Sequence, residues 1–575
     1  MNKRHALVNK TTSIRDTIQR MDEVPHRGGE PGIAVVLDQN QFILGAVTDG
    51  DIRRAIAQNI QLSDPVEKIM SVNPISVSSS LDTYSLLKEA LSKMRERGVR
   101  IEQVLLTDDE KKFFDIVNMH DLYKGADVLQ RPIAIYGLGF VGLTLAVALA
   151  ECDVFEVIGV DTNEDVIKKL RQGRTSFYEA GLDSALKQLQ SKDAITFLHD
   201  YSAVNADIHI ISVGTPIGED GKPVLDYLEK SARSLAPVLK RGDLVICRST
   251  VPVGTMRRFF IPLLEKGSGL KAGTDLHVAF APERTVEGAA LKELRSLPQI
   301  VGGLTDRCAE MAAALFRKLT STIVRVSSLE AAEITKLINN TFRDLSFSFA
   351  NEVAYLCDTY NINAFDVIEA ANEGYPRNPI SKPSPGVGGP CLTKDSLLYS
   401  CTSSDIMFSK PMLGAAGRKI NSQGADYVVW QYQKFLAMKK ISPKGQKVLV
   451  VGLAFKGWPE TSDMRDSPSL DLIKKLQNLG CRVFGYDAVI AAKEIEHLEV
   501  TPTNTIPEGL HDASAIFFMN NHLLNSKIDL YQSLPLMKKP SFFFDGWNMF
   551  GKNEVEGFPN VAYASMGYIT QPPSL

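Results

Sequence analysis

The stretch from Ile133 to Asp161 limits the fold of this 575-residue chain more than any other segment. An apolar strand, Ile133 to Tyr136, leads into glycines at positions 137, 139 and 142 and then into an apolar helix. A second strand ends in Asp161, 19 residues after Gly142. Glycines at this spacing permit a tight turn and a close approach to pyrophosphate at a helix N-terminus, while the acid accepts ribose hydroxyls. The segment predicts a dinucleotide-binding βαβ unit within a doubly wound α/β domain.

The residues around this unit favour NAD as the dinucleotide. Asp161 would repel the 2′-phosphate of NADP, and no arginine immediately follows it. Two later strands end in small and hydroxyl residues, including Thr215 and Thr250, and the carboxyl ends of strands line the cofactor cleft in such a sheet. Glu283 and Arg284 follow one more strand end, and taken alone they are better explained as a surface ion pair.

Length, charge and cysteine usage narrow the class of protein. The length suggests roughly three to four domains. A net charge of -3 gives no bias toward nucleic acid or an anionic membrane, and no run approaches the ~18 apolar residues of a membrane helix. The seven cysteines are scattered without a CxxC pair, which argues against a disulfide framework or a zinc site, and the N-terminus lacks an apolar signal core. We expect a cytoplasmic protein that binds no nucleic acid, no membrane and no metal.

The segment from Pro385 to Asp395 combines three glycines with Cys391, Lys394 and Asp395. Glycine backbone can approach a ligand closely and adopt positive φ values. The apolar-rich run after Thr393 predicts a helix, so Cys391 would lie near a helix N-terminus, where the dipole and the neighbouring lysine favour the reactive thiolate. The alternative is a buried structural cysteine in a turn, which is the commoner role of a free cysteine.

A long helical pattern runs from Glu330 to Asp358. Its apolar stripe recurs at steps of three and four residues, and we expect this face to pack against protein. The stripe consists of Ile334, Ile338, Phe342, Leu345, Phe349, Val353 and Leu356. Lys336, Asn340 and Arg343 follow a line roughly opposite to the stripe. These three residues indicate either a functional face or a solvated one, and asparagine is a poor helix former in such a position.

A further α/β unit begins at Lys447 and lacks the full glycine fingerprint. Lys456 lies just past its first strand and Arg465 in the following loop, so both cations would suit a diphosphate at the carboxyl edge of the sheet. The N-terminal 124 residues contain an internal repeat that resembles a pair of cystathionine-β-synthase (CBS) domains. The matching positions, which contact an adenine nucleotide in such pairs, are Thr48, Asp51, Asn118 and Asp121. The alternative for this segment is a docking module without a ligand.

With these motifs in hand, residues 131 to 575 resemble the UDP-glucose/GDP-mannose dehydrogenase family. The matching motifs, in the family's order, are GLGFVG (137–142), VGTP (213–216), STVPVGT (249–255), PER–EG (282–288), K–––NTFR (336–343), GVGGPCLTKD (386–395) and GLAFK with the later DMRDSP (452–468). The resemblance implies two Rossmann-like doubly wound domains joined by a long helical segment and preceded by an α+β CBS pair. The expected boundaries are 1–124, 131–325, 326–425 and 443–575.

The resemblance also implies a chemistry: a four-electron oxidation of a nucleotide-sugar C6 alcohol to a carboxylate by two NAD. Cys391 would attack the aldehyde intermediate, and a second hydride transfer would convert the thiohemiacetal to a thioester. Lys336 and Asn340 would stabilise the oxyanion. Glu283 would act as base and position water, with support from Asp395 and Thr250.

The same resemblance assigns the binding residues. NAD would contact Gly137, Gly139, Phe140, Val141, Gly142, Asp161, Thr215, Thr250 and Lys394. The UDP-sugar would contact Glu283, Arg284, Lys336, Asn340, Arg343, Gly388, Lys456 and Arg465. The long helix would form the centre of a homodimer or of a higher homo-oligomer, and the CBS pair would bind AMP, ADP or ATP.

Three short motifs point to the sugar. Pro282-Glu283-Arg284, Thr341-Phe342-Arg343 and Tyr375-Pro376-Arg377 resemble the branch that oxidises UDP-N-acetylglucosamine or UDP-N-acetylmannosamine. Two positions depart from the family: Trp547 replaces an arginine that can contact the sugar, and Ser462 replaces an acid. The alternatives are a UDP-glucose 6-dehydrogenase and a catalytically dead nucleotide-sensing regulator. The intact Cys391 argues against the second.

Overall fold

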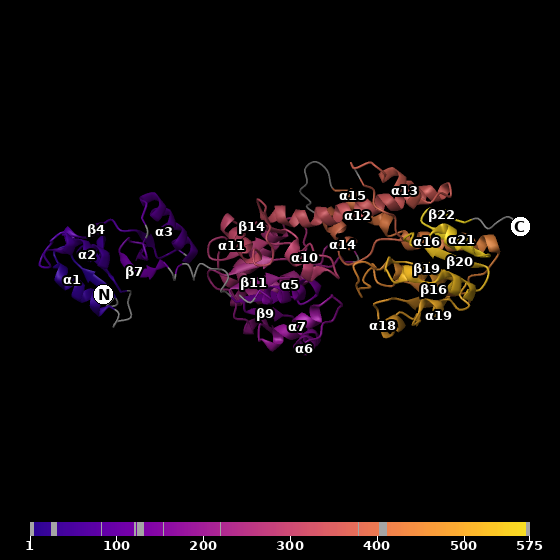
Figure 1. Ribbon diagram of the computed structural model, residues 1–575, viewed down its shortest axis with the longest axis horizontal. Coiled ribbons are helices and arrows are strands. Elements are labelled where there is room, and N and C mark those ends of the chain that lie inside the picture. The colour runs from indigo at the N-terminus through magenta and orange to yellow at the C-terminus, as the bar shows by residue number, and fades with distance from the viewer. Residues whose placement is uncertain are drawn as a thin grey trace. The chain divides into compact units, whose positions relative to one another are not determined.

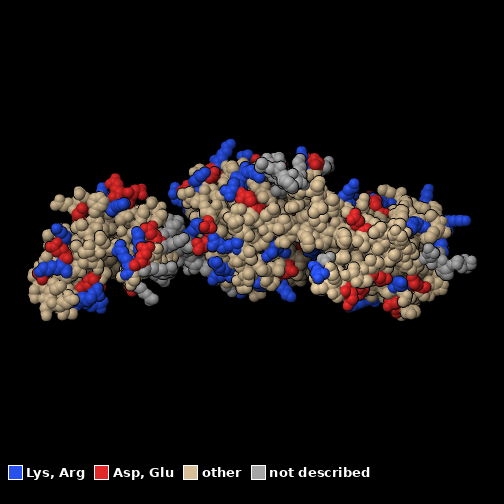
Figure 2. Space-filling view, turned by 90° about the horizontal axis from the view of Figure 1, so that it is seen from above, with Lys and Arg blue, Asp and Glu red and all other residues tan. Residues whose placement is uncertain are grey.

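The computed structural model describes residues 5–570 except 25–30, 82, 100, 120–121, 123–131, 153–154, 219, 378 and 402–410. The chain forms two compact units, Met1–Gln130 and Arg131–Leu575. Figure 1 colours the first unit indigo and the second from magenta to yellow. Positive and negative side chains are interspersed over the face that Figure 2 presents.

The first unit contains the predicted repeat. Each half has a helix packed on an antiparallel hairpin, and apolar residues of both hairpins share one cluster, among them Val35, Ala46, Leu105 and Ile116. The strands are β1 (Ala6–Val8), β2 (Ile33–Leu37), β3 (Ile43–Thr48), β4 (Ser71–Val72), β5 (Ser76–Ser78), β6 (Gln103–Thr107) and β7 (Phe113–Asn118). The helices are α1 (Ile14–Glu23), α2 (Asp49–Ala57) and α3 (Thr83–Arg97). The predicted CBS-type α+β organisation is confirmed, and its last residues, Asp121 included, lie outside the described part.

The second unit begins with an eight-stranded sheet in the order β10-β9-β8-β11-β12-β13-β14-β15, parallel except between β13 and β14. Its first six strands have the doubly wound order that creates a switch point between β8 and β11. The strands are β8 (Ile133–Tyr136), β9 (Val157–Val160), β10 (Ile195–Leu198), β11 (Ile208–Ile211), β12 (Leu244–Cys247), β13 (His277–Phe280), β14 (Gln299–Gly303) and β15 (Ile323–Arg325). The helices are α5 (Phe140–Ala150), α6 (Glu164–Arg171), α7 (Leu182–Ser191), α8 (Asp226–Leu235), the π-helical turn η6 (Met256–Phe260), α9 (Ile261–Ser268), α10 (Ala290–Ser296) and α11 (Asp306–Phe316).

A seven-stranded sheet closes the second unit, in the order β18-β17-β16-β19-β20-β21-β22. It is parallel except for the pair β21 and β22. The strands are β16 (Lys447–Val451), β17 (Arg482–Tyr486), β18 (Thr501–Pro502), β19 (Ala515–Phe518), β20 (Ser541–Asp545), β21 (Val561–Ser565) and β22 (Tyr568–Ile569). The helices are α17 (Pro468–Asn478), α18 (Ala492–Glu496), α19 (Ile506–Leu510), α20 (Leu530–Ser533) and α21 (Lys552–Glu556). The predicted fold class, two doubly wound sheets joined by helices, is confirmed.

A helical segment lies between the two sheets, and Figure 1 shows its helices α12, α14 and α15 side by side. The 31-residue α12 spans about 46 Å at 1.5 Å per residue. The helices are α12 (Leu329–Thr359), α13 (Ala364–Asn372), α14 (Leu392–Ser400), α15 (Leu413–Asn421) and α16 (Gly424–Lys439). Among the residues described, no helix combines the length and the apolar character that a membrane span requires.

The long helix α12 buries its polar face and exposes much of its apolar stripe. Phe342 is 74% exposed and Leu356 is 63% exposed, whereas Asp344 and Asn351 are buried. The expectation that the stripe packs against protein is therefore wrong within a single chain. The reason is that polar side chains of α12 find partners on α14, α15 and α16, which cover the opposite face.

Asp344 is the centre of these polar contacts. Its Oδ1 accepts hydrogen bonds from Arg418 Nη1 at 2.8 Å and Asn421 Nδ2 at 2.7 Å, both on α15. Its Oδ2 accepts one from the Ser396 hydroxyl of α14 at 2.9 Å. Arg418 also donates to the carbonyl of Val387 at 2.8 Å, so the same network holds the glycine-rich loop that precedes α14.

Candidate active site

The glycine turn before α5 fits a dinucleotide. Gly137 has φ +88, and a Cβ there would meet Ser212 O at 2.9 Å. A Cβ on Gly142 would lie 1.9 Å from Gly137 O, whereas Gly139 faces open space within 4 Å. The first and third glycines thus permit the turn and the helix packing, and the second leaves room for a pyrophosphate beside the half-buried Phe140 and Val141. These residues fit NAD, and Asp161 lies at the end of the neighbouring strand, where Oδ2 accepts from Leu138 N at 2.8 Å.

Three of the predicted cofactor residues meet at the carboxyl edge of this sheet. The Thr215 hydroxyl donates to the carbonyl of Thr250 at 2.5 Å and accepts a hydrogen bond from Lys394 Nζ at 3.0 Å. Thr215 and Thr250 follow β11 and β12, while Lys394 comes from the first turn of α14. The structure therefore joins the sheet to the helix that carries Cys391.

Cys391 is the residue immediately before α14, as predicted, and its side chain is accessible to solvent. Protein atoms nevertheless crowd around it, and the resulting desolvation raises the pKa of its thiol. Lys336 and Lys394 oppose this rise in pKa, while Asp395 and Glu287 add to it. The expectation that the helix and the lysine favour a thiolate is wrong for the free chain, because desolvation and two carboxylates outweigh them.

Asn340 and Asp395 form a short polar contact beside Cys391. The Asn340 amide donates to Asp395 Oδ2 at 2.6 Å, across α12 and α14. Asp395 is completely buried, and its Oδ1 has no hydrogen-bond partner in the described residues, with Lys394 Nζ 3.9 Å away. This oxygen is therefore a buried acceptor that the described residues leave without a donor. Lys336 is buried on the same face of α12, and its charge acts on both Cys391 and Glu283.

Glu283 is paired with Arg248, a residue that the sequence analysis missed. Oε2 of Glu283 accepts from Arg248 Nε at 3.0 Å and from its Nη2, while Oε1 accepts from the backbone N–H groups of Arg284 at 2.7 Å and Thr285 at 2.8 Å. Burial raises the pKa of Glu283, but Arg248, Thr285 and Lys336 more than offset this, and the pKa is lowered. With both oxygens occupied and the proton affinity low, this geometry does not fit the predicted role as base.

Glu287, four residues later, has the properties expected of a proton acceptor, although it was not among the predicted site residues. Burial, with a contribution from Asp463, raises its pKa to about 7, against the opposing charges of Arg465 and Lys456. A carboxylate that titrates near neutral pH can take up and return a proton during a reaction. Glu287 is the second acid of the PER–EG motif, and this place in the motif is the signal that could have identified it from the sequence.

The two cations predicted to hold a diphosphate both lie beside Glu287. Lys456 Nζ donates to the carbonyl of Glu287 at 2.5 Å, and Arg465 Nη2 lies 3.6 Å from its carboxylate. Arg465 also pairs with Asp463. Burial lowers the pKa of Lys456 to about 8, with Glu287 opposing the shift. Both side chains are thus assembled at the predicted place, bound to protein groups that a diphosphate would replace.

The glycine-rich loop has a role in packing that the sequence did not indicate. A Cβ on Gly388 would lie 2.3 Å from Asp466 O, and one on Gly389 would lie 2.7 Å from the Phe455 ring. Both contacts are with the loops that follow β16. The glycines thus allow the segment before Cys391 to pack against the elements that carry Lys456 and Arg465.

Of two further predicted substrate residues, Arg343 lies close enough to act on Lys456, and Arg284 is bound elsewhere. The Arg284 guanidinium donates to the carbonyl of Pro298, within its own domain. Arg343 is exposed on α12, 5.9 Å from the Phe347 ring, and its charge contributes to the low pKa of Lys456. The structure therefore places Arg343 near Lys456 and gives Arg284 a partner of its own.

In the first unit, Thr48 and Asp51 form a capping box at the start of α2. The Thr48 hydroxyl and backbone N–H bond Asp51 Oδ2 at 2.7 and 2.8 Å, and Arg54 pairs with Oδ1 at 2.6 Å. Asn118 ends β7, and Asp121 lies outside the described residues. The box fixes two adjacent polar groups at a helix N-terminus, a suitable position for a phosphate or ribose.

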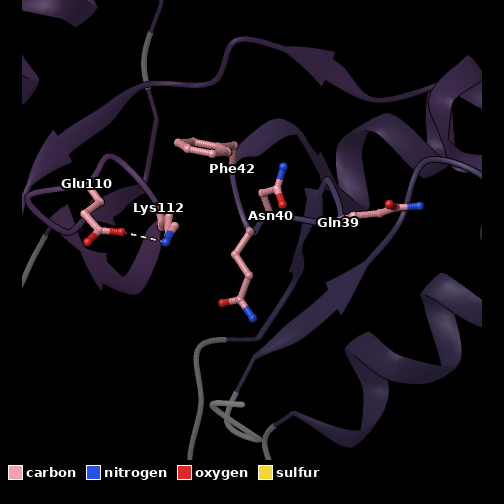
Figure 3. A pocket seen from close by; sticks show the side chains of 6 residues that line it. Gln39, Asn40, Phe42, Glu110 and Lys112 are labelled. Carbon is pink, nitrogen blue, oxygen red and sulfur yellow. Dashed lines mark hydrogen bonds and ion pairs between the residues drawn. The ribbon is translucent and has the colours of Figure 1, made fainter.

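A depression of about 590 Å³ lies elsewhere in this unit, where the tips of the two hairpins meet. Figure 3 shows the Phe42 ring directed toward the ion pair of Glu110 and Lys112, whereas the Gln39 side chain extends away from that pair. Neither Thr48 nor Asp51 lines it. No set of three or more metal-ligating side chains is grouped in the part of the chain that the structure describes.

Comparisons with known families cover most of the chain. Residues 131–320, 330–423 and 449–552 match the NAD binding, central and UDP binding domains of the UDP-glucose/GDP-mannose dehydrogenase family. Residues 1–58 and 66–126 match the CBS domain.

Individual relatives agree with these matches. The chain is 32% identical to a UDP-N-acetyl-D-mannosamine dehydrogenase of Pyrococcus horikoshii over 72% of this chain and 95% of the relative. It is 33% identical to a UDP-N-acetyl-D-glucosamine 6-dehydrogenase of Pseudomonas aeruginosa over 68% and 91%. Among solved structures, a UDP-D-ManNAc dehydrogenase from Pyrococcus horikoshii superposes with a TM-score of 0.68 at 31% identity, covering 76% of this chain and 99% of that one.

The raised pKa of Cys391 predicts slow alkylation near neutral pH. Because desolvation raises the pKa of this thiol above its ordinary value, only a minor fraction of Cys391 is ionised near neutral pH. Iodoacetamide modification of Cys391, followed by peptide mass spectrometry, is expected to accelerate with pH up to and beyond about 9. Lys336→Ala is expected to slow it further, because the ammonium favours the thiolate, while Cys401 at the other end of α14 serves as the internal control. A rate that levels off below about pH 7 would show a stable thiolate instead.

Proposed function

This chain belongs to the UDP-glucose/GDP-mannose dehydrogenase family and is an NAD-dependent nucleotide-sugar dehydrogenase, and we propose that its substrate is a UDP-N-acetylhexosamine. The observation that carries the proposal is the convergence of Lys336, Asp395 and Glu287 on Cys391, whose thiol is subject to the charge of each of the three. The names of the relatives from Pyrococcus and Pseudomonas support an N-acetylated sugar, with either the gluco or the manno configuration.

In the proposed mechanism, two NAD molecules, each held in turn at the glycine turn before α5, would supply the hydride acceptor for two oxidations. The first oxidation removes a hydride from C6 and a proton from its hydroxyl, which passes to water, and leaves an aldehyde. Cys391 then adds to the aldehyde carbon after losing its proton, and Glu287 is the neighbouring carboxylate with a pKa near 7 that accepts it. The second oxidation converts the thiohemiacetal to a thioester, and water releases the carboxylate product and the thiol.

The polar face of α12 stabilises the negative charge that forms during the reaction. The buried Lys336 ammonium supplies positive charge for the oxyanion formed when Cys391 adds to the aldehyde. Substrate binding also brings the negative diphosphate toward Lys456 and Arg465, which exchange their contacts with the Glu287 carbonyl and Asp463 for phosphate oxygens. Asn340 holds Asp395, whose free oxygen positions the hydroxyl or the hydrolytic water.

An assay with several nucleotide sugars tests this proposal. UDP-N-acetylglucosamine or UDP-N-acetylmannosamine is expected to yield two NADH per sugar, measured by absorbance, with little turnover of UDP-glucose or GDP-mannose. Cys391→Ser is expected to lose about 10³-fold or more of the turnover while binding NAD within about twofold of the unmodified protein. Cys401→Ser is the matched control on the same helix and retains activity.

The results separate the alternatives. Turnover of UDP-glucose alone would make the chain a UDP-glucose 6-dehydrogenase. Absence of turnover with every sugar, with and without adenine nucleotide, would favour a nucleotide-sensing regulator without catalysis.

We infer that the CBS pair binds an adenine nucleotide through Thr48 and Asp51. Asp51→Asn retains an acceptor for the helix cap but removes the charge that accepts ribose hydroxyls, so calorimetric affinity for AMP, ADP or ATP is expected to fall about tenfold or more. Glu110→Gln, in the depression at the hairpin tips, is the control and is expected to leave the affinity unchanged. A loss of affinity in Glu110→Gln but not in Asp51→Asn would place the nucleotide in that depression instead. No binding by the unmodified protein would make the pair a docking module.

We propose that the exposed stripe of α12 forms a homodimer interface. Large apolar side chains rarely form a continuous exposed patch on a monomer. Phe342→Asp is therefore expected to halve the mass measured by sedimentation, whereas Tyr531→Asp, which changes an 80% exposed tyrosine elsewhere, leaves it unchanged. An unmodified protein that is monomeric at micromolar concentration would contradict the proposal.

A further inference from the structure

Glu333 occupies a position on α12 that the mechanism above does not use. It lies three residues before Lys336 on the same helix and is 1% exposed. Oε2 accepts a hydrogen bond from the backbone N–H of Gly254 at 2.6 Å, and Oε1 accepts one from Met256 N at 2.8 Å. Each carboxylate oxygen therefore holds one N–H at the start of the helix formed by η6 and α9.

The backbone at this point is shaped to make the contact. Gly254 has φ +88, a conformation that favours glycine, and a Cβ there would lie 2.6 Å from the Arg258 guanidinium. The positive φ ends the loop 249–255, and the next helical turn directs its N–H groups toward Glu333. A negative side chain at a helix N-terminus is favourable, since the terminal N–H groups lack partners within the helix.

The same loop carries Thr250 and is fixed at its other end as well. The Ser249 hydroxyl donates to Val213 O at 2.7 Å, and Thr250 O accepts from Thr215. Thr250 thus lies between one anchor on the NAD-binding sheet and a second anchor on α12. Lys336 lies one helical turn beyond that second anchor.

We propose that Glu333 is a positioning residue: its carboxylate fixes the loop that carries Thr250 to the helix that carries Lys336. It thereby sets how the NAD-binding edge of the first sheet lies relative to Lys336 and Cys391. This inference rests on the proposed function, in which Lys336 stabilises the oxyanion, and on the position of Thr250 at the edge of the sheet that fits NAD. The chain also joins the same two elements by the partly exposed pair of Glu330 and Arg257, at 2.6 Å. That pair holds the helices together at the surface without contacting the loop.

The link between the loop 249–255 and α12 depends on the ionised form of Glu333. Burial raises the pKa of Glu333 to about 7, with Glu330 adding to the rise and Arg258 and the two backbone N–H groups opposing it. Arg257 on η6 and Cys247 on β12 are the other titratable groups whose ionisation responds to its charge. Protonation turns one acceptor oxygen into a donor facing an N–H, so the loop is held by a single hydrogen bond at low pH.

Glu333→Gln reproduces the protonated state at every pH. The expected result is a kcat at least tenfold below that of the unmodified protein above about pH 8, with KM for the UDP-sugar within twofold. The ratio of the two kcat values is expected to approach one below about pH 6. Taking the ratio removes the contribution of Glu287, which both proteins share. A purely structural defect would lower kcat by a factor that does not change with pH.

Glu330→Gln is the matched control, one turn earlier on α12, and is expected to stay within twofold at every pH. A kcat ratio for Glu333→Gln within twofold at all pH values would overturn the proposal. So would a loss of activity in Glu330→Gln with the same pH dependence.

Hydrogen exchange tests the link between the loop and Glu333 without any variant. It is measured by mass spectrometry on peptides of the unmodified protein that span residues 250–260. Protection, corrected for the intrinsic rate, is expected to fall at least fivefold between pH about 8 and 6, and unchanged protection would overturn the proposal even if Glu333→Gln fails to fold. If the unmodified protein oxidises no UDP-sugar, the proposed function fails, while hydrogen exchange still decides whether Glu333 holds the loop.

Discussion

Asp344 is buried on the polar face of α12, and helices α14 and α15 supply the partners of its carboxylate. Burial raises its pKa, while Arg418 and the hydrogen bonds of Asn421 and Ser396 favour its charged form. A buried charge without partners costs several kcal/mol, so α14 and α15 must both pack on this face. Through Arg418 and the carbonyl of Val387, the requirement extends to the glycine-rich loop that precedes Cys391.

This arrangement explains how side chains from distant parts of the chain come together around Cys391. Thr250 comes from the first sheet, Lys336 from α12, Cys391 from the start of α14, and Lys456 from the second sheet. Since the polar face of α12 is buried within the chain, the apolar stripe is left on the surface. The proposed dimer interface and the buried catalytic face are thus two consequences of one helix.

The sequence predicted the parts of the structure that depend on local pattern. The glycine fingerprint and Asp161 identified the first sheet, the run after Thr393 identified α14 with Cys391 before it, and the hairpin pattern identified the CBS-type repeat. It missed the pairing of Arg248 with Glu283, because 35 residues separate them and only the fold brings them together. It also gave the wrong direction for the pKa of Cys391, since desolvation by distant elements is invisible in a linear motif.

The central claim is that Cys391 carries the sugar during turnover. Its most direct test is acid quenching of the protein while it oxidises a UDP-N-acetylhexosamine with saturating NAD, followed by proteolysis and mass spectrometry of the cysteine-containing peptides. If Cys391 is the nucleophile, the peptide with Cys391 carries the mass of the uronyl sugar nucleotide as a thioester that hydroxylamine removes. Turnover without an adduct on this peptide, or with the adduct on Cys401, would contradict it.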